Sequence, residues 1–337
     1  MYVIEVTPLG RGIPLASLSY FSKAPYERGT LLSIPVRKKS TQGVVMSVQE
    51  VSAAKAALRG APFLLRRLPS QKELQSLPLP LLRTVDELSE YYAVQPGATL
   101  FALLPNEIRN GTVPLSAGDR PKREDREHAY EVLEAPADMR VLAYQRLIRT
   151  SFAKRESVLL VVPTIEDSDF LYTFLSAGIA HRTLVLNSGL GITGLRRAYT
   201  SLAENPEAAL VIATPQYAFF TRDDVGTVIL ERSRSFAYRT RARPYVDFRH
   251  ALMVYARHQG QRLVSADALV RSEDEFLLRE NRALPFEDHH PKRLDLSGTL
   301  KLIPMNEKAD GRFFTFFSDR LLSEIEKTRA HRGRALL

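Results

Sequence analysis

The chain has 337 residues, 45% of them hydrophobic and 25% charged, which is enough apolar material for two or three domains. Its 47 Lys and Arg outnumber 38 Asp and Glu, and the net charge of +9 favours polyanionic partners such as nucleic acid. The absence of cysteine excludes disulfides, thiolate zinc sites and cysteine nucleophiles. Because no signal peptide opens the chain and no apolar run is long enough to span a bilayer, we expect a cytoplasmic protein without membrane partners.

Residues 1–105 predict a small β-rich domain. Short strand-like runs, YVIEV, TLLSIPV and GVVMSV, are separated by proline and glycine. A helical stretch follows, with apolar residues at helical spacing: Leu81, Leu82, Val85, Leu88 and Tyr92. The pattern predicts a compact barrel-like module closed by one helix, with no evident catalytic group.

Residues 106–128 are polar and rich in Gly, Pro and charge, which is typical of a linker. From 129 to 290, strand-like runs (SVLLVVP, RTLVLNS, AALVIATP, GTVILE and QRLVSA) alternate with helical ones. The predicted helices include residues 166–177, 194–204 and 246–258.

The same region carries local signals for helix ends. Thr164 followed by Asp167 resembles a capping box, and Gly178 suits a helix stop. Alternating strands and helices predict an α/β domain with a parallel sheet covered on both faces, a RecA-like lobe of the P-loop type.

The stretch from Gly226 to Tyr245 contains the end of a predicted strand and the residues that indicate whether this lobe hydrolyses a nucleotide. Its strand ends at Glu231, where open α/β sheets place their chemistry. A nucleotide hydrolase needs one acid there to hold Mg²⁺ and a second to orient water. This chain has one acid followed by arginines, which indicates a nucleotide site that has lost its chemistry.

Four segments of the first 105 residues resemble, in order and spacing, the N-terminal 3′-DNA-end-binding domain of the PriA family of replication-restart helicases (primosomal protein N′). They are LSYF at 18–21, RGTLLSIPVRKK at 28–39, QGVVMSV at 42–48 and EYYAVQPGATLFALLP at 90–105. The resemblance implies binding to the 3′ end of a nascent DNA strand. The family carries a winged-helix domain at the position of residues 106–128, which are too few to encode one.

The resemblance continues into the first helicase lobe of the family. LLVVP at 159–163, LNSGL at 186–190, LVIATPQYAFF at 210–220 and RPYVDFRHALMVYARHQG at 243–260 keep the family order. Residues 291–337 resemble the connector toward the second lobe, which is not part of this sequence. The resemblance implies an ATP-dependent 3′–5′ DNA helicase whose partners are DNA and replication-restart proteins.

The DNA-end pocket departs from the family pattern. The family's Phe-Asp-Tyr corresponds to a segment containing Ser19 and Tyr20, and an expected glycine is replaced by Arg37, Lys38 and Lys39. A hydroxyl still bonds a sugar and cations still hold phosphates, so we predict general DNA binding through these five residues. The alternative is an inherited barrel with a solvated basic loop.

The nucleotide motifs depart further. The P-loop position, residues 135–141, has no glycine; Pro136 removes a backbone donor, and Asp138 would repel a triphosphate. Arg140 stands where lysine is expected, and Val141 cannot ligate Mg²⁺. We therefore predict that neither ATP nor Mg²⁺ is a cofactor.

The hydrolytic acids of the family are also changed. The family's Asp-Glu-x-His aligns with Glu231, Arg232, Ser233 and Arg234. Glu231 could still hold a cation, but Arg232 cannot act as a base because its pKa exceeds about 12. The Ser-Ala-Thr coupling motif survives only as Ser265-Ala266-Asp267. We predict no catalytic residue, and place Asp138, Arg140, Glu231 and Arg232 in a degenerate nucleotide site.

An arginine run follows this site. Arg239, Arg241 and Arg243 are interleaved with aromatic residues, a combination suited to phosphates and stacked bases, and we predict that they bind DNA. The alternative is a solvated rim loop whose aromatic residues, Phe236, Tyr238 and Tyr245, pack inward.

Two further motifs carry weaker hypotheses. Gly189, Gly191 and Gly194 spell the dinucleotide fingerprint, but they do not open the first βαβ unit and no acid ends the next strand. His289 and His290 could suggest a metal, although adjacent side chains rarely face one ion. We predict neither a nicotinamide or flavin site nor a metal site.

The sequence thus predicts a PriA-like protein that binds fork or single-stranded DNA in replication restart without hydrolysing ATP. The alternatives are an ATP-dependent 3′–5′ helicase, or half of one completed by a separate chain, and an interaction protein that binds no DNA. The predicted domains are 1–105 (DNA-end binding), 106–128 (linker), 129–290 (degenerate lobe) and 291–337 (connector).

Overall fold

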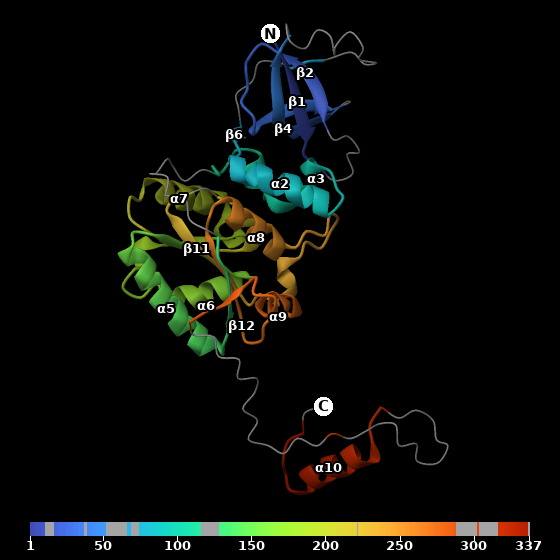
Figure 1. Ribbon diagram of the computed structural model, residues 1–337, viewed down its shortest axis with the longest axis vertical. Helices are drawn as coiled ribbons and strands as arrows, with labels where there is room; N and C mark the ends of the chain where they lie inside the picture. The colour runs from blue at the N-terminus through green and yellow to red at the C-terminus, as the bar shows by residue number, and fades with distance from the viewer. Residues whose placement is uncertain are drawn as a thin grey trace, which may run out of the picture. The chain divides into compact units, whose positions relative to one another are not determined.

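A computed structural model describes residues 1–10, 17–36, 39–51, 66–68, 74–115, 128–220, 222–287, 302 and 316–335. The chain divides into two compact units, Met1–Pro291 and Lys292–Leu337. The first unit contains two sheets, one at the N-terminus and one in the middle of the sequence (Figure 1).

The N-terminal sheet has six strands in the order β5-β2-β1-β4-β3-β6. The strands are β1 (Tyr2–Pro8), β2 (Leu18–Ser22), β3 (Thr30–Val36), β4 (Lys39–Glu50), β5 (Arg66–Arg67) and β6 (Gln75–Ser76). The four long strands pair antiparallel. Alternate residues of β1 and β3, among them Ile4, Val6, Leu32 and Ile34, are buried in one apolar cluster, as expected for a sheet with one covered face.

Three helices follow this sheet: α2 (Leu79–Tyr91), α3 (Pro96–Leu103) and α4 (Asn106–Arg109). Both α2 and α3 have proline in their first turn, where its missing N–H costs nothing. Gly97 lets α3 approach β1, because a Cβ at this position would lie 2.0 Å from the carbonyl oxygen of Pro8. This close approach gives the Pro-Gly pair of the EYYAVQPG segment a structural role.

The first part of the segment predicted as a linker, residues 106–115, is folded and packed in the structure. Residues 106–115 form α4 and a packed turn in which Ile108, Val113 and Leu115 are buried. The side chain of Gln75 holds this turn by accepting from the Leu115 backbone N–H at 2.9 Å. The apolar residues at 108, 113 and 115 are spaced too irregularly to stand out in a polar stretch. Residues 116–127 lie outside the described residues.

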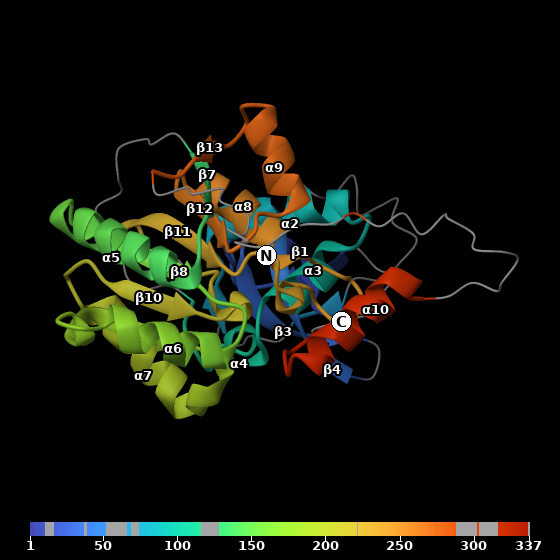
Figure 2. The same ribbon diagram turned by 90° about the horizontal axis from the view of Figure 1, so that it is seen from below.

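The second sheet has seven parallel strands in the order β13-β7-β12-β11-β8-β10-β9 (Figure 2). They are β7 (Tyr130–Glu134), β8 (Ser157–Val161), β9 (Thr183–Leu186), β10 (Leu210–Ala213), β11 (Val225–Glu231), β12 (Arg262–Asp267) and β13 (Leu284–Pro285). Every residue of β8, β10 and β11 is buried, which explains why these strands read as continuous apolar runs.

Helices cover both faces of this sheet. They are α5 (Ala137–Ala153), α6 (Ile165–Leu175), α7 (Gly191–Glu204), α8 (Phe248–His258) and α9 (Ser272–Arg279), with short 3₁₀ helices η1 (Ala180–Arg182), η2 (Ser188–Leu190), η3 (Pro215–Tyr217) and η4 (Phe236–Tyr238). Helices α5 and α6 share one apolar cluster with Val158 and Leu160 of β8. Helices α7 and α8 share another with Leu159 and Val161 (Figure 1). The predicted α/β fold with a RecA-like parallel sheet is confirmed.

The cluster on the α7 and α8 face continues into the N-terminal domain. Leu31 and Val44 of the first sheet, Leu81 of α2 and Leu252 of α8 all belong to this single cluster of buried residues. Polar contacts reinforce the same junction, where Arg257 of α8 donates to both carboxylate oxygens of Glu87 on α2. The two sheets are therefore joined by a common apolar core as well as by the chain.

The second unit contains α10 (Asp319–Ala330), whose N-terminus is capped by the Ser318 hydroxyl accepting from Leu321 N–H at 3.2 Å. Most of the predicted connector, residues 291–337, precedes this helix and lies outside the described residues. None of the described helices combines the length and the apolar character that a bilayer span requires.

Candidate functional site

Two residues singled out in the sequence meet at the carboxyl edge of the parallel sheet. Arg140 lies in the first turn of α5, and Glu231 is the last residue of β11. The guanidinium binds the carboxylate through two hydrogen bonds, Nε to Oε2 at 3.0 Å and Nη2 to Oε1 at 2.7 Å. Their side chains are only 4% and 7% exposed. The pair is a buried, bidentate salt bridge.

Neighbouring groups satisfy the remaining polar atoms of this pair. Arg140 Nη1 donates to the Ala135 carbonyl at 2.7 Å, and the hydroxyl of Tyr144, one turn further along α5, donates to Glu231 Oε2. Tyr238 donates its hydroxyl to the Glu231 carbonyl at 2.7 Å. The bonds from Arg140 Nη1 and from the Tyr144 hydroxyl offset part of the desolvation cost that burying two charges imposes, and the Tyr238 bond fixes the backbone at the end of β11. The four side chains are named below as the sealed edge: Arg140, Tyr144, Glu231 and Tyr238.

The protonation of the sealed edge follows from its surroundings. Burial works to lower the pKa of Arg140, but its hydrogen bonds and attraction to Glu231 outweigh burial and raise the pKa above its ordinary value. Burial, followed by the charge of Glu231, raises the pKa of Tyr144 well above its ordinary value. Arg140 therefore remains a cation, and Tyr144 remains a hydrogen-bond donor.

The residues at this edge do not fit Mg·ATP. Both carboxylate oxygens of Glu231 already accept from Arg140, so a metal would have to break a bidentate ion pair. Pro136 occupies the N-cap of α5 with no side-chain cap, so the peptide that should cradle phosphate lacks an N–H. Asp138 is exposed in the first turn, where its charge opposes a phosphate.

Arg232 sits at the rim and has a partner of its own. Its backbone has φ of +51°, which turns the chain sharply after β11. Its Nη1 donates to Asp167 Oδ1 at 2.7 Å, and this hydrogen bond is the main reason that its pKa is raised. Thr164 Oγ1 accepts from the Asp167 N–H at 3.2 Å, which confirms the predicted helix cap. Arg232 thus helps to close the sheet edge.

The segment predicted as a remnant of the coupling motif, Ser265-Ala266-Asp267, is also held within the fold. Ser265 Oγ donates to Asp274 Oδ2 at 2.7 Å, and Tyr130 donates to the other oxygen of this buried carboxylate at 2.7 Å. Asp267 Oδ2 accepts from the Arg234 N–H at 2.8 Å, which fixes the turn after β11. Both polar residues of the motif are structural in this arrangement.

The arginine run that follows lies on the outside. Arg241 and Arg243 are exposed, and within the described ranges neither side chain forms an ion pair. Arg239 is also exposed, and its Nε contacts Asp247 Oδ2 at 3.3 Å. Of the interleaved aromatics, Tyr238 packs inward, whereas Phe236 (86% exposed) and Tyr245 (61%) do not. The expectation of inward-packed aromatics is therefore met only by Tyr238.

A buried arginine that the sequence analysis missed anchors this loop. Arg249 donates Nε to Asp247 Oδ1 at 2.8 Å and Nη2 to Oδ2 at 2.6 Å, and its Nη1 donates to the Ser233 carbonyl at 2.7 Å. Burial acts to raise the pKa of Asp247, but the bonds from Arg249 and then Arg239 bring it below its ordinary value. The sequence contained a signal for this anchor, because Asp247 directly precedes an amphipathic helix and such an Asp is a typical N-cap.

In the N-terminal domain the structure corrects the prediction for Tyr20. This residue of β2 is only 3% exposed, and its hydroxyl donates to the Pro35 carbonyl at 2.9 Å. Because strand residues alternate between faces, Tyr20 faces the core while Ser19 pairs with Glu5 of β1. Tyr20 is a core residue and not part of an open pocket.

The predicted basic loop of this domain lies between β3 and β4. Lys39 is exposed where β4 begins, paired in register with Val36. Arg37 and Lys38 lie outside the described residues. The structure therefore places one of the three cations at the tip of a hairpin, on a different element from Tyr20.

The two weaker motifs gain no supporting geometry. Gly189 lies in η2 and Gly191 begins α7, directly after β9, which is the last strand of the sheet order, and Asn187 Oδ1 accepts from the Gly189 N–H at 2.9 Å. His289 and His290 lie outside the described residues, and among those described no group of His, Asp and Glu could hold a metal ion.

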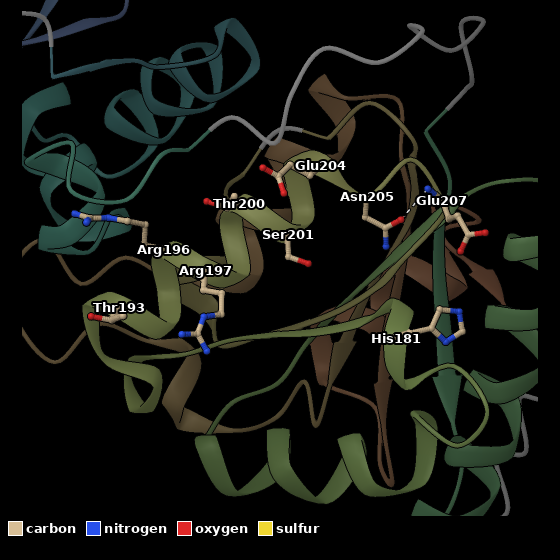
Figure 3. Close-up of a pocket in the computed structure, with 9 residues that line it drawn as sticks. All are labelled: His181, Thr193, Arg196, Arg197, Thr200, Ser201, Glu204, Asn205 and Glu207. Carbon is tan, nitrogen blue, oxygen red and sulfur yellow. Dashed lines mark hydrogen bonds between the residues drawn. The ribbon is translucent and has the colours of Figure 1, made fainter.

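A groove of about 710 Å³ runs along the outer face of α7 (Figure 3). Arg196 and Arg197 line it together with His181 and the acids Glu204 and Glu207. Arg196 donates to the Thr112 carbonyl at 3.2 Å, and Glu207 contacts Arg182 at 3.4 Å. The mixture of cations and acids describes a solvated helix face, and the groove shares no residue with the sealed edge.

The fold and the site define a class of protein: a RecA-like parallel-sheet domain, preceded by a small β domain, whose carboxyl edge is closed by an ion pair. No protein-family model matches the chain. The chain is similar to the replication restart protein PriA of Helicobacter pylori strain ATCC 700392 / 26695, with 23% identity over an alignment of 306 residues that covers 83% of this chain and 46% of that protein. PriA of H. pylori strain J99 gives 23% identity over 304 residues, with the same shares.

The chain thus spans about half the length of the curated relatives it matches. Among solved structures, the UvsW helicase from bacteriophage T4 matches with a TM-score of 0.35 and 11% identity, over 62% of this chain and 78% of that one. That likeness is too weak to support an inference.

Proposed function

We propose that the chain is a PriA-like DNA-binding protein that holds fork or single-stranded DNA in replication restart and does not hydrolyse ATP. The observation that carries the proposal is the sealed edge. Arg140 and Glu231, at the positions where the nucleotide motifs are expected, satisfy each other with two hydrogen bonds in a buried environment. A site whose charges are already neutralised has little to offer a triphosphate.

The DNA-binding half of the proposal rests on charge and exposure. Arg241 and Arg243 present guanidinium groups to solvent, and exposed Phe236 and Tyr245 lie beside them in the chain. Guanidinium groups bind phosphates, and exposed rings stack on bases of single strands. Similarity to the replication restart protein PriA supports DNA as the polyanion and replication-restart proteins as partners.

In the N-terminal domain, the proposed DNA contacts are Ser19 and the basic hairpin of Arg37, Lys38 and Lys39. Lys39 is exposed and Ser19 is half-buried, so both have surface available. Contacts of this type position a strand without reading its sequence. A protein with these contacts should bind DNA through its backbone and lose affinity as salt rises.

The test is a titration of labelled forked DNA at about 50 mM salt and at rising salt, together with an ATPase assay on the same complex. We expect binding with a steep salt dependence and no ATP turnover above a blank. A Glu231→Gln variant serves as the control, because it keeps the shape of the side chain and removes its charge. Turnover by the wild type that disappears in Glu231→Gln would favour the helicase alternative, and absence of binding at low salt would favour an interaction protein without DNA.

A further inference from the structure

Three rings meet where the N-terminal domain contacts the parallel-sheet domain. Tyr91 and Tyr92 end α2, and His250 lies in the first turn of α8. The centroids of the Tyr91 and His250 rings are 4.4 Å apart, and those of Tyr91 and Tyr92 are 5.0 Å apart. Tyr92 in turn accepts a hydrogen bond from the Asp247 N–H at 3.1 Å. These three residues are named the junction platform.

Tyr91 is the open member of the junction platform. It is 70% exposed, although it belongs to a helix whose other apolar residues are largely buried. Its two ring neighbours meet it at interplanar angles of 66° and 82°, so no parallel ring is stacked on it. The ring is held in place by edge contacts while its surface stays available, which lowers the entropy cost of stacking on a further ring.

A loop with two exposed arginines leads into the junction platform. The loop that carries Arg241 and Arg243 ends at Asp247, the residue whose backbone N–H binds Tyr92. Two acids beside the platform are already neutralised, because Asp247 is bound by Arg249 and Arg239, and Glu87 is bound by Arg257. Glu90, directly before Tyr91, is exposed and forms no ion pair among the described residues. We therefore expect an anionic chain held by this loop to reach a fixed, open aromatic ring.

We propose that Tyr91, supported by His250 and Tyr92, stacks on an unpaired base of single-stranded DNA whose phosphates contact Arg241 and Arg243. The proposal rests on the DNA-binding function above and adds a contact at the domain junction. Only unpaired bases expose their faces, so the platform selects single strands over duplex. Burial lowers the pKa of His250, which keeps its ring neutral at physiological pH and leaves the positive charge to the arginines.

The test compares Tyr91→Leu, which keeps apolar bulk without a flat ring, with Tyr91→Phe, which keeps the ring. Binding to a labelled poly-dT oligonucleotide is followed by fluorescence anisotropy. We expect Tyr91→Leu to weaken binding by about 5- to 150-fold, the range for loss of one base–aromatic stack, and Tyr91→Phe to stay within about twofold of wild type. Thermal unfolding checks that both variants fold, as expected for substitutions at an exposed side chain.

Two controls separate stacking from other effects. Phe174→Leu removes another exposed ring, paired with Phe170 at 4.8 Å on α6, and should leave DNA binding unchanged. An abasic strand of the same length has the same charge but no bases, so wild type and Tyr91→Leu should bind it equally weakly. Equal weakening of both strands by Tyr91→Leu would mean that Tyr91 acts through structure, and would overturn the proposal.

The outcomes also distinguish this proposal from the function on which it rests. If wild type binds poly-dT, and an Arg241→Ala/Arg243→Ala variant binds it less tightly while Tyr91→Leu does not, DNA binding stands and the stacking contact is wrong. If wild type binds no DNA at low salt, both proposals are overturned.

Discussion

Arginines occupy two regions close to the end of β11, and the two regions treat them in opposite ways. In the sealed edge, Arg140 is buried and commits its donors to Glu231 and to a backbone carbonyl. In the loop that follows, Arg241 and Arg243 are exposed and form no ion pair within the described residues. The same side chain stabilises the fold in one place and is available to a ligand in the other.

The difference teaches that residue type alone does not assign a role near the carboxyl edge of a parallel sheet. A guanidinium beside a buried carboxylate is a structural group, because separating the pair would leave a charge without solvent or partner. A guanidinium without a partner keeps its charge for phosphates. Arg232 lies between these extremes, since its side chain is 52% exposed and is paired with Asp167.

The largest expected effect is on the sealed edge. Arg140→Ala should lower the free energy of unfolding by about 3–5 kcal/mol, because it leaves Glu231 buried without a counter-charge. Chemical denaturation followed by circular dichroism measures the change. The double variant Arg140→Met/Glu231→Leu should lose less stability than the single one, since it removes both charges. A loss below about 1 kcal/mol for Arg140→Ala would show that the pair is not structural.

The next effect concerns the exposed loop and is seen in binding. The double variant Arg241→Ala/Arg243→Ala should weaken single-stranded DNA binding on the order of tenfold and reduce the salt slope by about 0.7 for each phosphate that the loop no longer neutralises. Its stability should stay within about 0.5 kcal/mol of wild type. Arg279→Ala, which removes an exposed cation from α9, is the matched control and should change neither property. An unchanged salt slope in the double variant would contradict the assignment.

A smaller effect is expected at the intermediate residue. Arg232→Ala should lower the free energy of unfolding by about 0.2–1 kcal/mol, the range for an ion pair that solvent reaches. Alanine keeps a Cβ at the position with φ of +51°, so the change isolates the ion pair from the backbone conformation. Asp167→Asn should have an effect of similar size, and a double-mutant cycle in denaturant measures the coupling. A loss as large as that of Arg140→Ala would remove the distinction between rim and sealed edge.

The smallest effect extends the comparison to histidine. Burial lowers the pKa of both His128 and His250, whereas Glu231 keeps Arg140 charged. Because the unfolded chain binds these protons more readily, stability should be full above the unfolded pKa near 6.5 and fall as the pH drops through it toward the folded pKa. Denaturation between about pH 7 and pH 5 measures this slope. His250→Gln and His128→Gln should each make stability depend less on pH in this range, and the double variant should have the weakest dependence. A stronger pH dependence in these variants would contradict the predicted direction of the pKa shifts.

Much of the parallel-sheet domain was predictable from its sequence. Fully buried strands such as β8 and β11 are continuous apolar runs, and α6 begins at the cap predicted from Thr164 and Asp167. These features depend on local composition and on short-range hydrogen bonds, which a sequence displays directly. The packed turn of residues 106–115 was missed because its few apolar residues belong to a cluster most of whose other members lie far along the chain.

The sequence predicted where the site residues lie in the fold, but it did not predict which of them bind each other. Parallel topology brings the end of β11 near the first turn of α5, so the proximity of Arg140 and Glu231 could be expected. That they bind each other depends on backbone placement and rotamer, which no spacing encodes. Tyr144 offered a signal, since it lies four residues after Arg140 on one helix face, but its hydrogen bond to Glu231 requires the folded sheet.

The apolar cluster that runs from Leu31 and Val44 through Leu81 to Leu252 also determines how the protein unfolds and how it responds to proteases. Separating the β domain from the parallel-sheet domain would expose the apolar residues of this cluster to water. Exposed apolar surface of this kind promotes aggregation. Heating should therefore melt residues 1–287 in a single calorimetric transition. Proteases should find no cleavage point that releases either domain in soluble form.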